Sequence, residues 1–298
     1  MKVFHHNDLD GECSAYWCNY VEDQSSKTFI RINYDKRFPI ERVEKDELVY
    51  IVDFSIQPEE LTNLLKITPN VVWIDHHKTT IEKYKDFPLL NKTKGIRYSN
   101  DEEPLAACML TYIYVMIMQK RNIQDFYPAF AEDAPYFTKL ISDWDTWNLK
   151  DRNVEPFVVG CRLHDTRPKS NFWKQLYNFD FIAKVIKEGE LCIRYRDNWA
   201  GSYMHSFGFE TEFEGYKCFC VNLGQCNSQY FKSIKSNKYD IYITFVFNGE
   251  KYNVSLYSTK IDVSEIAKKY GGGGHAGASG FTCSSLPFLK QNKRRRHE

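Results

Sequence analysis

Carboxylate and imidazole side chains follow three apolar, strand-like runs of this sequence. One run covers residues 2–6, the second 48–52 and the third 71–74, and each of them ends in or next to Asp or His. A parallel strand that is buried on both faces opens onto a ligand site at its carboxyl end. The side chains at these three ends are His6, Asp8, Asp10, Asp53, Asp75, His76 and His77.

With one of Asp143 or Asp145, these positions other than His77 would bring about five carboxylates and two imidazoles to one edge of a sheet, where like charges repel unless cations neutralise them. A mixed His and carboxylate donor set without thiolate favours manganese, or iron, zinc or cobalt, over magnesium or calcium. One ion takes about four to six ligands. The donor set therefore predicts two divalent ions that share a bridging Asp, an arrangement that supports in-line displacement at phosphorus.

The elements that must position these residues follow from the hydrophobic pattern. Strands are expected over 2–6, 28–33, 48–52 and 71–74, with helices over 12–22 and 58–66 and a short helical turn near 40–46. This alternation predicts an α/β fold, a mostly parallel sheet with helices on both faces. The run 104–119 is apolar on nearly all sides and predicts a buried core helix, too short for a membrane span. A further helix is expected over 135–147.

The second half of the chain predicts a helical connector and a smaller mixed α/β domain. Helices fill 172–206, and strands follow at 217–222, 240–249 and 251–257, the last two forming a hairpin across Asn248-Gly249. A helix is expected over 262–269. The expected divisions are a catalytic domain at 1–150, a connector at 151–209, a substrate-binding domain at 210–285 and a basic tail at 286–298.

Length and charge limit the class of protein. A chain of 298 residues suits two domains, and a net charge of +1 gives no overall attraction to nucleic acid, so an anionic substrate must be held by a local site. No apolar run approaches the length of a membrane span, and the N-terminus leads directly into a strand, which predicts a soluble, cytoplasmic protein without a membrane partner. The nine cysteines lack paired C-x-x-C spacing and are expected to be reduced thiols. The oligomeric state is left open, and a homodimer is possible.

Four glycines, Gly271 to Gly274, precede His275. Glycines allow close backbone approach and expose amide N–H groups, and the imidazole can donate to an anionic oxygen. A flexible linker is the alternative. The flanking strand-like runs favour an ordered turn inside a domain.

These residues together resemble a known family. Asp75-His76-His77, with His6-Asn7-Asp8-Leu9-Asp10-Gly11, Asp53 and Asp143, resembles the four motifs of the DHH phosphoesterase superfamily. Residues 272–281, which include Gly272, Gly273, Gly274 and His275, resemble the signature of its C-terminal DHHA1 domain. The opening motif is most similar to the NrnB-like oligoribonuclease and cyclic-nucleotide phosphodiesterase branch.

The resemblance implies a role for each matched residue. His6 and Asp8 would bind one manganese ion and Asp10, His76 and Asp143 the other, with Asp53 bridging. Asp75 would fix the tautomer of an imidazole or act as a weak ligand. His77 would contact the substrate phosphate or the leaving oxygen. His275 and the glycine amides would hold the terminal phosphate or nucleotide, which implies an active site between the two domains.

Two placements of metal ligands stay open. Asp143 is favoured over Asp145, its second choice, because it directly follows the apolar Leu140-Ile141. His5 could replace His6, but only one of two adjacent strand residues points into a site.

The family commonly has Arg where this chain has Tyr257, and Tyr cannot bind phosphate bidentately. Either Arg162, Lys260 or Arg97 supplies that contact, or a base stacks on Tyr257. Residues such as Arg162 and His164, in the run 160–164, are more often plain surface or cap residues than phosphate ligands.

The expected function is a manganese-dependent phosphodiesterase that degrades short single-stranded RNA or DNA oligonucleotides from the 3′ end to 5′-mononucleotides. The alternatives are hydrolysis of a cyclic mono- or dinucleotide signal, and a nucleotide-binding sensor without turnover. Inorganic pyrophosphatase activity is disfavoured by Gly272–His275, and a long-strand exonuclease by the absence of a further basic, aromatic domain. The role of Lys293–Arg296 stays open.

Overall fold

The computed structural model describes residues 1–289, except 24, 25, 35, 122, 124 and 235–237, so the basic run Lys293–Arg296 lies outside the described residues. The chain divides into unit 1, Met1–Cys192, and unit 2, Ile193–Glu298. Among the described residues, no helix combines the length and the apolar character that crossing a membrane requires.

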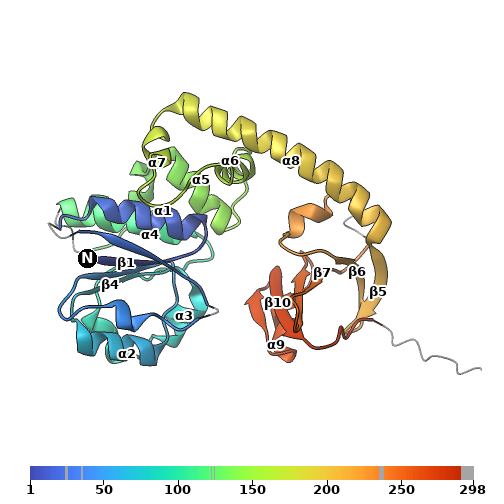
Figure 1. Cartoon of the computed structure of the whole chain (residues 1–298), viewed down its shortest axis with the longest axis horizontal. Helices are drawn as coiled ribbons and strands as arrows, with labels where there is room; N and C mark the ends of the chain where they lie inside the picture. Colours follow the sequence, from blue (N-terminus) through green and yellow to red (C-terminus); the bar gives the residue numbers. More distant parts are fainter. Residues whose placement is uncertain (24–25, 35, 122, 124, 235–237, 290–298) are drawn as a thin grey trace, which may run out of the picture. The chain divides into compact units, whose positions relative to one another are not determined.

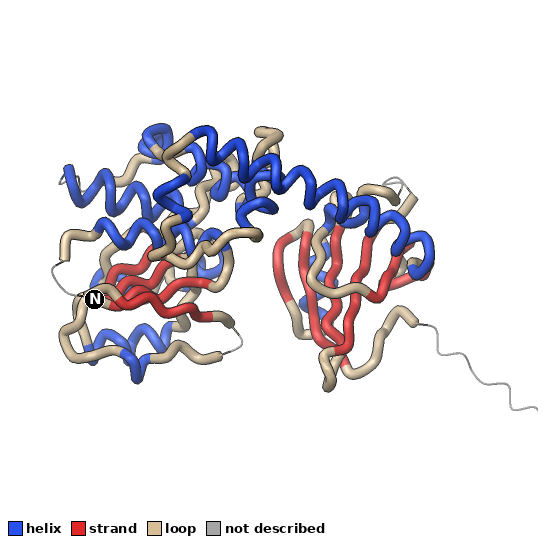
Figure 2. The backbone as a smooth tube through the Cα atoms, turned by 45° about the horizontal axis from the view of Figure 1, so that its top comes forward, coloured by secondary structure: helices blue, strands red, loops and turns tan. Residues whose placement is uncertain are grey.

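Unit 1 is built on a four-stranded parallel sheet (Figures 1 and 2). Its strands, in the order β2-β1-β3-β4, are β1 (Lys2–His6), β2 (Thr28–Ile32), β3 (Val49–Val52) and β4 (Val71–Ile74). Bridges from Val72 to Lys94 and from Asp75 to Arg97 add an irregular parallel segment beside β4. Because all four strands run the same way, their carboxyl ends lie along one edge, as the sequence predicts.

Helices cover both faces of this sheet (Figure 1). Alternate strand residues divide between two cores, since successive side chains of a strand point to opposite faces: Tyr50 and Val52 belong to one, Val49 and Ile51 to the other. The first core includes α1 (Leu9–Trp17), α4 (Ala107–Tyr112) and α5 (Tyr136–Asp145), and the second α2 (Pro58–Ile67). The predicted α/β class is therefore confirmed.

The remaining helices of unit 1 and the helix that leads out of it are α3 (Lys78–Lys83), α6 (Val154–Cys161), α7 (Phe172–Gln175) and α8 (Phe179–Phe207), with 3-10 turns η1 (Cys18–Tyr20), η2 (Ile40–Arg42), η3 (Leu90–Lys92) and η5 (Pro128–Asp133). The boundary between the two units falls within α8.

The helix expected over 12–22 begins earlier and ends earlier. Asp8 caps its N-terminus, because the carboxylate accepts a hydrogen bond of 2.9 Å from the backbone N–H of Gly11. The helix α1 therefore starts at Leu9, and Asp10 lies in its first turn instead of in a loop. This shift matters, because it places Asp10 on the buried side of the helix.

The apolar run expected as one helix over 104–119 has two parts. Regular α4 ends at Tyr112, and residues Ile113–Gln119 continue as the π-helical segment η4. Most of both segments is buried, as the continuous apolar pattern predicts.

Unit 2 contains a six-stranded mixed sheet in the order β5-β6-β7-β8-β10-β9 (Figure 2). Its elements are β5 (Phe209–Phe213), β6 (Tyr216–Asn222), 3-10 turn η6 (Ser228–Phe231), β7 (Ile241–Phe247), β8 (Tyr252–Tyr257), α9 (Val263–Lys269), β9 (Gly273–His275) and β10 (Ala278–Cys283). The predicted hairpin across Asn248-Gly249 is confirmed by the antiparallel pairing of β7 with β8.

The glycine run is ordered within this unit. Gly271 adopts φ +76° just after α9, and the N–H groups of Gly271 and Gly272 donate to carbonyls of that helix, which closes its C-terminus. Gly273 begins the edge strand β9. A Cβ on Gly272 would lie 2.0 Å from the carbonyl oxygen of Gly280, so close backbone packing requires glycine there.

Candidate metal centre

The carboxyl ends of β1, β3 and β4 gather the chemistry-bearing side chains of unit 1. β1 ends at His6 and leads through Asp8 into α1, β3 leads into Asp53, and β4 leads into Asp75, His76 and His77. The start of α1 packs tightly against the end of β1. A Cβ on Gly11 would lie 2.3 Å from the carbonyl oxygen of His6, so only glycine allows this approach.

His6, Asp8 and Asp53 form the first potential ligand group. The Nδ1 atom of His6 lies 2.7 Å from Asp8 Oδ2 and 3.7 Å from Asp53 Oδ2. Burial alone would lower the pKa of His6, but the carboxylates of Asp53 and Asp8 raise it to about 10. Burial would likewise raise the pKa of Asp8, and the hydrogen bond with His6 instead lowers it to about 2.

Asp10, His76 and Asp145 form the second group. The Nε2 atom of His76 lies 3.2 Å from Asp145 Oδ2, 3.5 Å from Asp53 Oδ1 and 3.9 Å from Asp10 Oδ2. Asp10 is held by the N-terminus of α4, where its oxygens accept hydrogen bonds of 3.0 and 2.8 Å from the backbone N–H groups of Ala107 and Cys108. Burial raises the pKa of Asp10 well above its usual range.

The residues of all the ligand groups together form the metal cluster: His6, Asp8, Asp10, Asp53, His76, His77 and Asp145. Asp145, the second choice at this position, lies in the cluster, and Asp143 lies in none of the ligand groups found among the described residues. The two residues are two apart on α5, which turns their side chains about 200° from each other. The Asp143 carboxylate instead accepts a hydrogen bond of 2.9 Å from the side chain of Asn148.

Asp53 connects the groups. It belongs to the set with His6 and Asp8 and also to a third set with His76 and His77, and the ligand atoms of each set lie within 4.8 Å of one another. Its backbone has φ 53°, a left-handed conformation that Asp tolerates better than most residues, and it lies directly after β3. Non-glycine residues held in this region cluster at functional sites.

Two buried atoms of the cluster fit a bound cation. Asp53 Oδ2 and His76 Nε2 are shielded from solvent and have no hydrogen-bond partner among the described residues. Burial, together with the neighbouring Asp8 carboxylate, raises the pKa of Asp53 well above its usual range. Carboxylates this close resist simultaneous ionisation unless positive charge is present, so the donor set suits divalent metal ions.

Asp75 orients an imidazole from behind the cluster. It is fully buried, and its Oδ1 accepts from the Nδ1 of His77 at 2.6 Å and from the backbone N–H of His76 at 2.9 Å, while Oδ2 accepts from Ser55 Oγ at 3.1 Å. The Nδ1 hydrogen bond leaves Nε2 of His77 as the nitrogen free to meet a metal ion or substrate. Burial would lower the pKa of His77, but the Asp75 hydrogen bond raises it.

Tyr34, which sequence reasoning missed, lies beside the cluster. Its ring centroid is 5.4 Å from that of His6, and the ring stacks on Phe54 at 4.7 Å. Its hydroxyl oxygen accepts a hydrogen bond of 3.1 Å from the backbone N–H of Ser55. The available signal was its position two residues after β2, at the same edge of the sheet as the other strand ends.

The other residues of unit 1 that the sequence suggests as candidates belong to none of the ligand groups. His5 is buried, with Nδ1 donating to the His6 carbonyl at 2.9 Å, and burial lowers its pKa to about 4. Arg97 donates to the carbonyls of Trp73 and Lys94. Arg162 and His164 line a pocket that also contains cluster carboxylates.

In unit 2, Lys260 donates to the Tyr239 carbonyl at 2.9 Å. Tyr257 is buried, and its hydroxyl donates to the Cys226 carbonyl at 2.7 Å, so stacking a base on it would require the ring to leave this contact. His275 is exposed on β9. The roles of Tyr257, His275 and the glycines in binding substrate stay predictions.

Comparison with known proteins finds one domain match and relatives that cover most of the chain. Residues 223–294 match the model of the DHHA1 domain. The chain is 26% identical over 320 residues to oligoribonuclease NrnB of Bacillus subtilis, covering 95% of this chain and 72% of that protein. It is 24% identical over 275 residues to an uncharacterized protein of Acanthamoeba polyphaga mimivirus, covering 86% of this chain and 59% of that protein.

The fold also has a counterpart among solved structures. An exopolyphosphatase-related protein from Bacteroides fragilis superposes with a TM-score of 0.52 at 14% identity, covering 96% of this chain and 87% of the other. The chain therefore has a match to the DHHA1 domain in unit 2 and is similar over most of its length to an oligoribonuclease, and in unit 1 its Asp and His side chains lie at the carboxyl ends of β1, β3 and β4.

Proposed function

We propose that this protein is a manganese-dependent phosphodiesterase that hydrolyses short oligonucleotides from the 3′ end to 5′-mononucleotides. The observation that carries the proposal is the set of three ligand groups joined through Asp53 and His76. The similarity to oligoribonuclease NrnB supports the substrate class.

Each residue of the cluster has a distinct part in this proposal. His6 and Asp8 would hold one ion, and Asp10, His76 and Asp145 the other, with Asp53 shared between them. When bound, two such ions generate a hydroxide nucleophile near neutral pH and stabilise the charge that develops on the transferred phosphoryl group. The mixed imidazole and carboxylate donors favour manganese over magnesium or calcium.

The chain itself orients the substrate. Asp75 fixes the ring of His77, so that its Nε2 can contact the scissile phosphate or the leaving oxygen. The ring of Tyr34, about half exposed, offers an aromatic face next to His6 for a nucleobase. We propose that His275 and its neighbouring glycine amides in unit 2 add contacts to a terminal phosphate.

The test is a comparison of wild-type protein with His76→Ala and with His205→Ala. His205 is an exposed histidine on α8 and serves as the matched control. We expect wild type and His205→Ala to release mononucleotides from labelled RNA dinucleotide and pentanucleotide in manganese. We expect His76→Ala to lose both activity and manganese binding. An intact dinucleotide in all reactions, with manganese bound, would overturn the proposal.

A further inference from the structure

A pocket of about 500 Å³ lies next to the metal cluster, entirely within unit 1. Cluster carboxylates Asp8, Asp10 and Asp145 form part of its lining, and the segment that follows α6 contributes Arg162, His164 and Thr166. A volume of a few hundred Å³ suits a small-molecule ligand.

The pocket contains one unpaired cation. Arg31 forms an ion pair with the buried Glu12, and Nε2 of His164 lies 2.7 Å from Glu188 Oε2, so both have partners. The nearby Arg167 pairs with Asp165, whereas across the described residues the side chain of Arg162 has no hydrogen bond or ion pair. Arg162 follows α6, where its backbone N–H donates to Val159, while the guanidinium remains available.

The apolar part of the lining fits a nucleoside. Ile141 and Val158 are buried, and the partly buried indole of Trp144 contributes an aromatic side chain. Flat apolar and aromatic walls accept a base without reading its identity. One pocket thus combines a place for the scissile phosphate at the cluster, apolar walls and an available guanidinium.

We propose that Arg162 binds a second phosphate of the substrate, separated from the scissile phosphate by one nucleoside in this pocket. The inference rests on the proposed phosphodiesterase function. A guanidinium binds phosphate oxygens bidentately and keeps its charge at all working pH values. The ligand chemistry is a phosphate attached to the nucleoside, found as the 5′-terminal phosphate of a dinucleotide or as the second diester of a cyclic dinucleotide.

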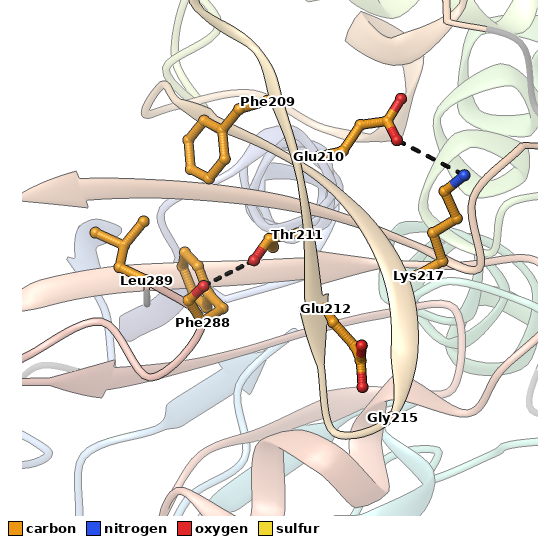
Figure 3. A pocket seen from close by; sticks show the side chains of 8 residues that line it. All are labelled: Phe209, Glu210, Thr211, Glu212, Gly215, Lys217, Phe288 and Leu289. Carbon is orange, nitrogen blue, oxygen red and sulfur yellow. Dashed lines mark hydrogen bonds and ion pairs between the residues drawn. The ribbon is translucent and has the colours of Figure 1, made fainter. Parts of the chain in front are cut away.

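The pocket of unit 2 shown in Figure 3 offers no comparable site. It measures about 620 Å³ and runs along β5, where Glu210 and Glu212 place carboxylates in its lining. Its lining cation, Lys217, is paired with Glu210 at 3.6 Å. The carboxylates in the lining of this pocket therefore disfavour a phosphate, whereas the pocket beside Arg162 offers an available guanidinium.

The test uses full-length wild type, Arg162→Ala, Arg162→Lys and the control Arg152→Gln. Arg152 is also exposed but is absent from the lining of this pocket. Each protein is assayed in manganese with a dinucleotide that carries a 5′ phosphate, with the same dinucleotide without it, and with a cyclic dinucleotide. Dissociation constants for phosphorothioate analogues of the two linear substrates give a readout independent of turnover.

We expect Arg162→Ala to lower kcat/KM for the 5′-phosphorylated dinucleotide by about 10- to 100-fold, mainly through KM, because a charge-assisted contact is lost. The unphosphorylated dinucleotide should change little. Arg162→Lys should recover part of the loss, and Arg152→Gln should match wild type. If Arg162→Ala also lowers kcat/KM for the cyclic dinucleotide, Arg162 binds a phosphodiester as well as the terminal monoester. If kcat/KM for the cyclic dinucleotide is unchanged, Arg162 binds the terminal monoester alone.

Equal efficiency of wild type and Arg162→Ala on every substrate would overturn the inference while leaving the proposed function intact. Wild type that cleaves none of these substrates would instead overturn the proposed function.

Discussion

Asp53 shows how a single residue connects the ligand groups of the candidate metal centre. It follows the buried strand β3 in a left-handed backbone conformation and contributes to two of the three ligand groups. One of its oxygens is buried without a hydrogen-bond partner among the described residues. A carboxylate in this state is destabilised by burial, and binding of a cation would relieve that cost.

The pair Asp143 and Asp145 gives the first prediction. We expect Asp145→Asn to lower manganese-supported activity by about 100-fold or more, because even groups that only orient a metal ligand are worth 10- to 100-fold. Asp143→Asn, the matched control on the same helix, should remain within about threefold of wild type, because its carboxylate points away from the cluster and accepts from Asn148. Steady-state kinetics with a manganese titration measures both. A greater loss with Asp143→Asn than with Asp145→Asn would contradict the placement.

Asp75 gives the second prediction. Replacing it with Asn removes the charge and one acceptor from a fully buried position that receives hydrogen bonds from His77 and from backbone N–H groups. We expect Asp75→Asn to lower kcat/KM by about 10- to 100-fold while the protein still binds manganese. Loss of bound metal in proportion to activity would show that Asp75 is itself a ligand.

At the scale of elements, the tight contact between α1 and β1 determines the geometry of the site. We expect Gly11→Ala to lower the free energy of unfolding by about 1–3 kcal/mol or more, because its Cβ would collide with a backbone oxygen at 2.3 Å. Gly201→Ala is the control. Gly201 lies within α8, and a Cβ there would come no closer than 3.6 Å to Ser233, an ordinary contact. The substitution should therefore leave the free energy of unfolding unchanged or raise it. Urea unfolding measures both changes, and a neutral Gly11→Ala would contradict the packing.

The strands and their polar ends could be predicted from the sequence because they depend on local signals. The apolar runs before Asp53 and Asp75 identify buried parallel strands, and parallel strands place their carboxyl ends at one edge. The start of α1 was misplaced because the sequence alone does not show that Asp8 caps the helix at Leu9.

The choice between Asp143 and Asp145 depends on the rotational phase of α5, which tertiary packing sets and the sequence does not state. The pocket at Arg162 could not be predicted for a similar reason. It requires the segment after α6 to lie beside the start of α1, and these segments are about 150 residues apart in the chain.

At the scale of the whole molecule, the clustered charges link folding to metal and to pH. Without bound metal, burial raises the pKa of Asp10 and Asp53 above the ordinary value of 3.8, and the carboxylates of Asp53 and Asp8 raise the pKa of His6 from 6.5 to about 10. A group whose pKa is raised by folding binds more protons in the folded state. The stability that it contributes is present below its unfolded pKa and is lost as the pH rises through its folded pKa.

We therefore expect the Tm of the metal-free protein to fall by about 3 °C or more between pH 5.5 and pH 8.5. The Tm of the manganese-loaded protein should fall less over the same pH range, because bound cations replace the lost protons in neutralising the carboxylates. Thermal unfolding followed by circular dichroism measures both forms. A metal-free Tm that rises or stays constant over this range would contradict the coupling.

The most direct measurement of the central claim is a product time course on 5′-labelled RNA dinucleotide, pentanucleotide and 24-mer, with cyclic AMP and a cyclic dinucleotide in parallel, in manganese and in chelator. If the protein is the proposed two-metal oligonucleotide phosphodiesterase, nucleotides should be released stepwise from the 3′ end of the short oligomers. Chelator should inhibit the release completely, and restored manganese should recover it. Short oligomers that remain intact in manganese, or that are cleaved equally well in chelator, would contradict it.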